Sequence, residues 1–138
     1  TFLAYQYDSD IRSLAVNLTW DCYDDTVCSF YEIVDYMKDF RYSVDGNQNS
    51  RLYPINKTIE TKSGDCENLS YLFAKLYAEA GGTVVVSCND CHCWTEVLLT
   101  DNIFEATEND RFIFDPTSGR VYAHDEWIIK EFDAMCHD

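Results

Sequence analysis

One change in the spacing of apolar residues limits the fold of this chain more than any other feature. Before Gly81-Gly82 the apolar residues recur every three or four positions, as they do in amphipathic helices. After these two glycines the period changes to two, which is typical of strands that bury one face. Helices followed by consecutive strands predict an α+β fold, in which N-terminal helices pack on an antiparallel β-sheet.

Three helices are predicted in the first part of the chain. They cover residues 9–20, about 26–40 and 66–80, and a loop is predicted over 42–62. The third helix carries an apolar stripe along one face and ends at Gly81-Gly82, a pair that suits a helix C-cap. It is therefore predicted to be the central buried helix.

The remainder of the chain is predicted to form strands and one further helix. The strands are placed at 83–88, 92–99 and 111–115, with shorter ones at 102–104 and 121–123. A last apolar group predicts a packing helix, and it consists of Trp127, Ile128, Ile129 and Phe132.

The whole chain, 1–138, is predicted to be a single domain, because it has no repeat, low-complexity tract or Pro/Gly-rich linker. No apolar run approaches the roughly 18 residues of a membrane span, so none is expected. The first residues lack the basic and apolar regions of a signal peptide. The missing initiator Met indicates a processed chain or part of a larger one.

The formal net charge is −15, and it is distributed unevenly, with −4 in residues 1–62 and −11 in residues 63–138. Such a chain repels a phosphate backbone, which argues against nucleic acid as a partner. An acidic surface commonly serves solubility alone, although it also suits a cationic substrate.

Seven cysteines are many for this length and indicate an oxidising, extracytoplasmic or cell-surface setting. Their odd number fits one reactive thiol and three disulfides, with the connectivity left open. The cysteines available for pairing are Cys22, Cys28, Cys88, Cys91, Cys93 and Cys136. Among them Cys22–Cys28 is a suitable local pair.

Cys66 stands at the predicted start of the third helix, directly after Gly64-Asp65. The unpaired N–H groups and the positive end of the helix dipole favour the thiolate, which is the reactive form of cysteine. Asp65 and Glu67 oppose it, so a reactive thiol here needs a nearby cation, such as a protonated histidine. Taken alone, Cys66 is equally well explained as a buried core cysteine or half of a disulfide.

His92 and Asp115 supply the other two groups of a nucleophilic triad. His92 shares one strand face with Trp94, and such a polar and aromatic face suits the edge of a site better than a core. Asp115 ends the next strand, which Pro116 stops at the carboxylate. Alone, each has an ordinary explanation, as a surface histidine or an Asp-Pro turn. Together with Cys66 they are a nucleophile, a base and an orienting carboxylate.

Three segments resemble the transglutaminase-like superfamily, and they are Ser63-Gly64-Asp65-Cys66-Glu67-Asn68-Leu69-Ser70, His92-x-Trp94-x-Glu96-Val97 and Asp115-Pro116-Thr117. The resemblance covers about residues 28–117 and is strongest to small microbial members. It implies a papain-like core, with the nucleophile at the start of the central helix and a Cys66–His92–Asp115 triad. It implies no cofactor and no metal. The family includes crosslinking acyltransferases, cysteine proteases, peptide amidases and inactive members.

The reaction implied is acyl chemistry on a protein or peptide substrate. The thiolate of Cys66 attacks an amide carbonyl, His92 protonates the leaving amine, and water or an amine resolves the thioester. The small size of the chain favours water, and hence a protease or amidase. The N–H of Cys66 is expected to be one oxyanion donor, with Tyr53 or Asn56 as a second and Trp94 as a further candidate for substrate contact.

Cys91 and Cys93, which flank His92, are unusual for the family and leave other interpretations open. Cys88-x-x-Cys91-His92 matches the pattern for covalent attachment of c-type haem. The same residues with Cys93 could hold zinc, although neighbours on an extended strand point to opposite faces. A binding module that kept the fold without the activity is a third alternative.

Overall fold

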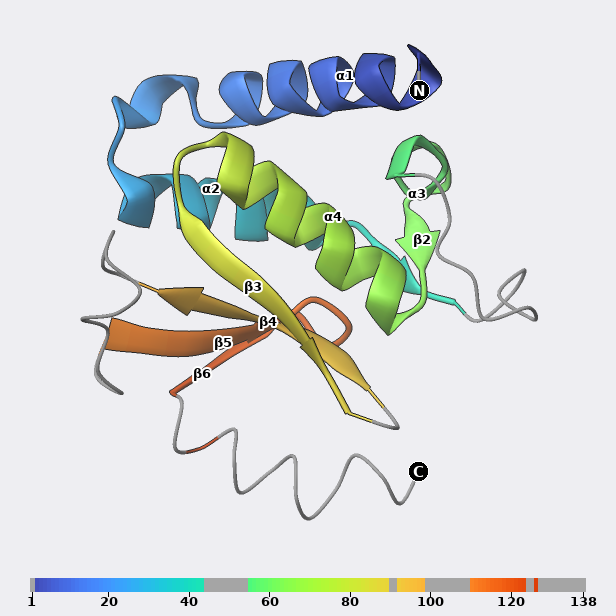
Figure 1. The fold of residues 1–138 in the computed structure, drawn as a ribbon. Coiled ribbons are helices and arrows are strands. Elements are labelled where there is room, and N and C mark those ends of the chain that lie inside the picture. The colour runs from blue at the N-terminus through green and yellow to red at the C-terminus, as the bar shows by residue number, and fades with distance from the viewer. Residues whose placement is uncertain (1, 44–54, 90–91, 99–109, 124–125, 127–138) are drawn as a thin grey trace.

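The structure, a computed structural model, describes residues 2–43, 55–89, 92–98, 110–123 and 126. Within these residues the predicted α+β fold is confirmed, with helices first and a four-stranded antiparallel sheet after them (Figure 1). No helix in this part of the chain has both the length and the apolar character that a membrane crossing requires.

The helices are α1 (Phe2–Leu18), the short 3-10 helix η1 (Trp20–Cys22), α2 (Thr26–Met37), α3 (Ile55–Thr61) and α4 (Cys66–Glu79). The sheet contains β3 (Thr83–Cys88), β4 (Cys93–Leu98), β5 (Arg111–Asp115) and β6 (Arg120–Ala123), paired in chain order. Two short strands, β1 (Arg41–Tyr42) and β2 (Ser63–Gly64), form a separate parallel pair. Figure 1 shows α4 between α1 and the sheet, and its contacts with both place it at the centre of the fold.

Among the described residues, the predicted elements from residue 65 onward agree with the structure to within one residue, and those before it differ more. The helix predicted at 9–20 begins earlier, at Phe2, and α2 ends at Met37 rather than near residue 40. The loop predicted over 42–62 is wrong, because it contains α3. This helix has seven residues and its buried residue is the polar Thr58, so no apolar period marks it. The predicted elements at 102–104 and 127–132 lie outside the described residues.

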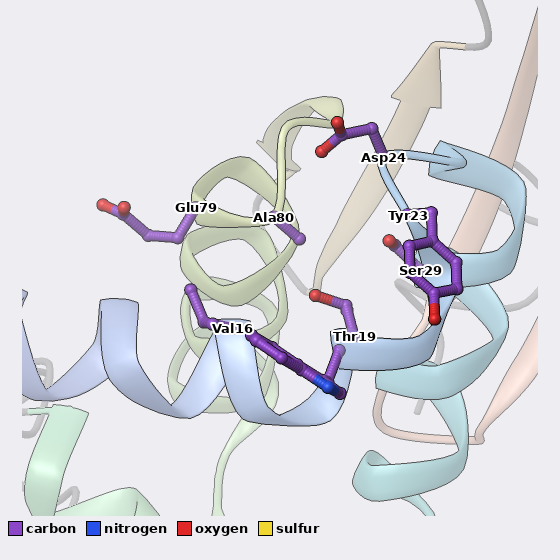
Figure 2. Close-up of a pocket in the computed structure, with 8 residues that line it drawn as sticks. Val16, Thr19, Tyr23, Asp24, Ser29, Glu79 and Ala80 are labelled. Carbon is purple, nitrogen blue, oxygen red and sulfur yellow. The ribbon is translucent and has the colours of Figure 1, made fainter.

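The end of α4 confirms the role predicted for the two glycines. Gly81 adopts a φ of +100°, which other residues rarely tolerate. Its N–H donates to the carbonyl of Ala78, and the N–H of Gly82 donates to the carbonyl of Tyr77, which together form a Schellman motif. At this end, Ala80 also lines a cavity that α1 and η1 border from the other side (Figure 2).

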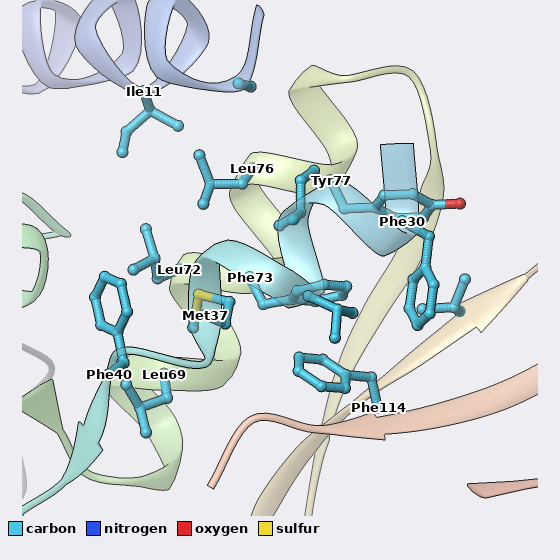
Figure 3. Packing of buried hydrophobic residues seen from close by; sticks show 14 residues of the cluster. Ile11, Phe30, Met37, Phe40, Leu69, Leu72, Phe73, Leu76, Tyr77 and Phe114 are labelled. Carbon is cyan, nitrogen blue, oxygen red and sulfur yellow. The ribbon is translucent and has the colours of Figure 1, made fainter. Parts of the chain in front are cut away.

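The core lies between the helices and the inner face of the sheet (Figure 3). Phe30 of α2 makes edge-to-face contacts, with ring centroids 4.8–6.1 Å apart, to Phe73, Tyr77, Phe112 and Phe114. Each such pair contributes roughly 0.5–1.5 kcal/mol beyond the burial of its area. Because the rings come from α2, α4 and β5, these contacts join the helix layer to the sheet.

The variant Phe73→Ala is expected to lower the free energy of unfolding by about 3–5 kcal/mol, because it leaves a cavity where α4 meets the sheet. Tyr71→Ala, on the same helix but 44% exposed, is the matched control and should cost much less. Urea denaturation measures both. Equal losses would show that the face of α4 turned to the sheet is not the principal core contact.

Candidate active site

The residues around Cys66 hold the first turn of α4 in place. The side chain of Asp65 accepts a hydrogen bond from the N–H of Asn68 at 2.9 Å, and the side chain of Asn68 accepts one from the N–H of Asp65 at 3.0 Å. This reciprocal arrangement is a capping box. Cys66 is partly buried and its thiol is free, so a nucleophile stands at the positive end of a well-ordered helix.

Gly64 is required for this helix start. A Cβ at Gly64 would lie 2.6 Å from the Cβ of Asn68, closer than real Cβ contacts come. Gly64 cannot move away, because its carbonyl accepts a hydrogen bond from the N–H of Ser43 and its strand is paired with β1. A side chain here would therefore displace the capping asparagine.

His92 directly precedes β4, at the end of the β3–β4 hairpin. Its N–H donates to Oδ1 of Asn89 at 2.8 Å, and the N–H of Asn89 donates to the carbonyl of His92 at 2.9 Å. Beside them a disulfide joins Cys88 and Cys93, which are register partners on β3 and β4. These links fix the backbone of His92 relative to the sheet.

The imidazole of His92 connects the thiol and the carboxylate. Its Nε2 lies 3.2 Å from Oδ1 of Asp115. The thiol of Cys66 is also a hydrogen-bond partner of the ring. The structure thus brings together the three residues predicted as nucleophile, base and orienting carboxylate, from the start of α4, the β3–β4 turn and the end of β5.

Asp115 is only 3% exposed and is held by the turn that follows β5. Its Oδ1 accepts a second hydrogen bond, from the N–H of Thr117 at 3.1 Å. Its Oδ2 accepts one from the hydroxyl of Ser118 at 3.1 Å. With both oxygens engaged, the carboxylate has a fixed direction and can orient the imidazole.

The pKa of His92 is raised from 6.5 to about 9. Burial by itself lowers it, because a buried site disfavours the charged imidazolium. The hydrogen bonds and negative charges of Asp115 and Cys66 outweigh burial. The imidazolium is therefore the main form at neutral pH, and it can serve as the cation that a thiolate beside Asp65 and Glu67 would need.

Trp94 covers one side of the imidazole. The two rings lie nearly parallel, at 19° and with centroids 6.3 Å apart, and Trp94 is buried against Ile113 and Tyr122 on the same sheet face. Attraction between a cation and an indole face is substantial within about 6 Å, so this separation makes it weak.

Tyr42 lies at the site although no sequence pattern marked it. On β1 it is the register partner of Gly64, two residues before Cys66. Its pKa is raised by burial first, and then by the negative charges of Cys66 and Asp65. The phenol is therefore within electrostatic reach of the thiol, while 52% of the residue is exposed. Two-residue strands carry no period, which is why the sequence could not indicate it.

The side chains predicted as oxyanion donors are not joined to Cys66 in the structure. Tyr53 lies outside the described residues. Asn56 is in the first turn of α3, which packs on β2 and α4, and its Oδ1 is buried without a hydrogen-bond partner. Among the described residues no hydrogen bond links Asn56 to Cys66, so its role stays a prediction.

The disulfide at Cys88 argues against the haem and zinc interpretations. A thioether to haem, or a zinc–thiolate bond, requires a sulfur that is not already bonded, and the sulfur of Cys88 is bonded to Cys93. His92 is turned towards Asp115, so its Nε2 is engaged as well. The donor set that those interpretations need is therefore not available.

A second disulfide confirms the predicted local pair, Cys22–Cys28. Two of the seven cysteines, Cys91 and Cys136, lie outside the described residues. The expectation of a third disulfide therefore stays a prediction.

Residues 12–116, well over half of the chain, match the sequence model of the transglutaminase-like superfamily. The matched segment contains Cys66, His92 and Asp115. The chain has no significant match among curated proteins or among solved structures.

The free energy of unfolding is expected to decrease as the pH rises from about 6.5 to about 9. His92 has a higher pKa in the folded state, so the folded protein binds more protons in this range and loses that stabilisation through pH 9. Urea denaturation at several pH values measures the slope. His92→Gln provides the baseline without this titration, and Asp115→Asn should reduce the slope. A wild-type slope equal to that of His92→Gln would contradict the raised pKa.

Gly64→Ala is expected to lower the free energy of unfolding by about 1–3 kcal/mol, because its Cβ overlaps Asn68. Alkylation of Cys66 should slow in the same variant, since the helix start is displaced. Ser63→Ala, at the neighbouring residue of β2, is the control. If both variants behave like the wild type, the close approach is not a constraint.

Proposed function

The chain belongs to the transglutaminase-like superfamily, which suggests cysteine-based catalysis in general, and we propose that it is a cysteine-nucleophile amide or peptide hydrolase. One observation carries the proposal. The imidazole of His92 lies 3.2 Å from the carboxylate of Asp115 and is also a hydrogen-bond partner of the thiol of Cys66. A nucleophile, a proton carrier and an orienting group in this order are the parts that acyl transfer requires.

The first half-reaction is acylation of Cys66. The thiolate attacks the carbonyl carbon of the amide and forms a tetrahedral oxyanion. The carbon–nitrogen bond then breaks, and the amine leaves with the proton of His92 Nδ1. Asp115 accepts a hydrogen bond from Nε2–H throughout and so keeps Nδ1 directed at the sulfur. The product is a thioester on Cys66 and a neutral His92.

The second half-reaction is hydrolysis. His92 removes a proton from water, the hydroxide attacks the thioester, and the carbon–sulfur bond breaks to release the acid and the thiolate. Water is the favoured acceptor because Cys66 is only partly buried and Tyr42 beside it is half exposed. Transfer to an amine would use the same intermediate, with the amine in place of water.

The oxyanion needs donors beside the carbonyl carbon under attack. The backbone N–H of Cys66 lies in the first turn of α4, where helical N–H groups have no helical partner. For the second donor we propose the hydroxyl of Tyr42, because Tyr42 is the register partner of Gly64 and its phenol is affected by the negative charge of Cys66. Tyr53 and Asn56 are the alternatives, and Trp94 is assigned to shielding of His92.

The substrate we propose is a protein or peptide. The net charge of −15 suits a cationic one, because it attracts positive charge towards the protein. The two disulfides are compatible with an extracytoplasmic or cell-surface location, since such bonds persist mainly in oxidising compartments.

Iodoacetamide labelling without reductant, read by intact mass, tests the nucleophile first. We expect rapid labelling at Cys66 that is absent in Cys66→Ala. His92→Gln should slow the labelling at pH 7 by about tenfold or more, because it removes the cation that stabilises the thiolate. Rapid labelling in His92→Gln, or none in the wild type, would contradict the proposed pair.

Turnover is then measured with a mixture of peptide amides, following amine release by mass spectrometry. Cys66→Ala should abolish release while the free energy of unfolding stays within about 1 kcal/mol of the wild type. Added alkylamine distinguishes the two acceptors, since an amide product appears only if an amine resolves the thioester. Full turnover by Cys66→Ala would rule out the mechanism.

A further inference from the structure

A cavity of about 420 Å³ lies at the opposite end of α4 from Cys66. Its walls come from the end of α1, η1, the first turn of α2 and the end of α4 (Figure 2). Because α4 has 14 residues, the helix alone separates the two ends by about 20 Å. The cavity is thus separate from the thiol site and needs its own explanation.

Two aromatic side chains of the cavity wall are unusually exposed. Trp20 is 72% exposed and Tyr23 is 86% exposed, although large aromatic residues normally gain most from burial. Their ring faces carry negative electrostatic potential and attract cations. An apolar wall of this kind next to water favours a ligand that is partly apolar and positively charged.

The charged groups of the wall are carboxylates. Asp24 lines the cavity and forms no ion pair within the described part of the chain. Glu79 lines it from α4, and Lys75 at 3.8 Å offsets part of its charge. The wall includes no basic side chain among the described residues, so the cavity carries a net negative charge.

Ser29 adds a buried polar group to the same cavity. The residue is only 2% exposed, and its hydroxyl takes part in none of the hydrogen bonds formed among the described residues. Figure 2 shows the side chain of Ser29 among the residues that line the cavity. Its oxygen is not among the fully buried polar atoms that lack a partner, so it opens onto the cavity, where a donor from a ligand can reach it.

The loop that presents these groups is held in an uncommon conformation. Tyr23 and Asp24 both have positive φ, +50° and +68°, and neither is glycine. The disulfide Cys22–Cys28 closes the loop around them. Backbone conformations of this kind persist only where the surrounding structure enforces them. The aromatic ring and the carboxylate are therefore presented in a fixed arrangement.

We propose that this cavity binds the lysine or arginine side chain of a basic peptide. Asp24 and Glu79 neutralise the positive charge, the ring of Trp20 covers the apolar stem and the cation, and the hydroxyl of Ser29 accepts a hydrogen bond from it. A peptide fits better than a free amine, because Trp20 and Tyr23 expose apolar surface at the cavity that a small amine would leave uncovered. The chain's charge of −15 draws such a peptide in.

The test is a titration of the full chain carrying Cys66→Ala, so that no acyl transfer can occur. The probe is a short acetylated and amidated peptide with one central lysine, and binding is followed by NMR shifts of backbone amides. We expect shifts at Trp20–Asp24 and Ser29. The same peptide with norleucine should bind at least fivefold more weakly, because it lacks the charge. A rise in salt should weaken the lysine peptide.

Site variants complete the test. Trp20→Ala and Asp24→Asn should each weaken binding about fivefold. The controls Tyr31→Phe and Asp39→Asn, both exposed and outside the cavity wall, should leave the binding affinity within twofold of the wild type.

Three outcomes would overturn the proposal: equal binding of the lysine and norleucine peptides, shifts centred on the Cys66 end, or equal loss of binding in site and control variants. Binding of n-butylammonium as tightly as the peptide would also overturn the proposal, because the ligand would then be a free amine. If the peptide does not bind at this cavity, labelling of Cys66 in the wild type is still expected. Failure of the cavity proposal is therefore distinguishable from failure of the hydrolase proposal.

Discussion

The burial of α4 between α1 and the sheet is the interaction on which the rest of the structure depends. Its inner face is completely buried, and the rings of Phe73 and Tyr77 pack against Phe30 from α2. The same helix carries Cys66 at its start, and the sheet it packs on carries His92 and Asp115. Hydrophobic packing of one helix therefore brings together three polar groups that lie far apart in the sequence.

The site contains an electrostatic conflict that His92 resolves. The helix start needs Asp65 as its cap, yet a carboxylate there opposes a thiolate at the next residue. Because the net charge of the chain is −15, its overall charge does not compensate a negative thiolate at Cys66. An imidazolium stabilised by Asp115 does, and its raised pKa keeps it charged at neutral pH. In the proposed mechanism, His92 and Asp115 thus permit a stable helix start and a reactive thiol together.

Both described disulfides close short turns and do not link distant elements of the fold. Their cysteines are six and five residues apart, so the closed loops are small and restrict the unfolded chain only modestly. One lies beside His92 and the other beside Tyr23 and Asp24. Their main effect is therefore local, since each fixes a turn that presents side chains to the site or the cavity.

The sequence by itself determined whatever depends on local periodicity and capping. The apolar stripe and the Gly81-Gly82 stop define α4, alternation defines β3 to β5, and the motifs alone mark Cys66, His92 and Asp115 as the candidate triad. Only the tertiary structure decided which nitrogen of His92 faces Asp115, which cysteine pairs with Cys88, and that Tyr42 lies within electrostatic reach of the thiol. It also revealed α3 and the cavity at the far end of α4. The reason is physical: a helix or strand repeats over neighbouring residues and leaves a pattern, whereas contacts between distant segments depend on how the elements pack.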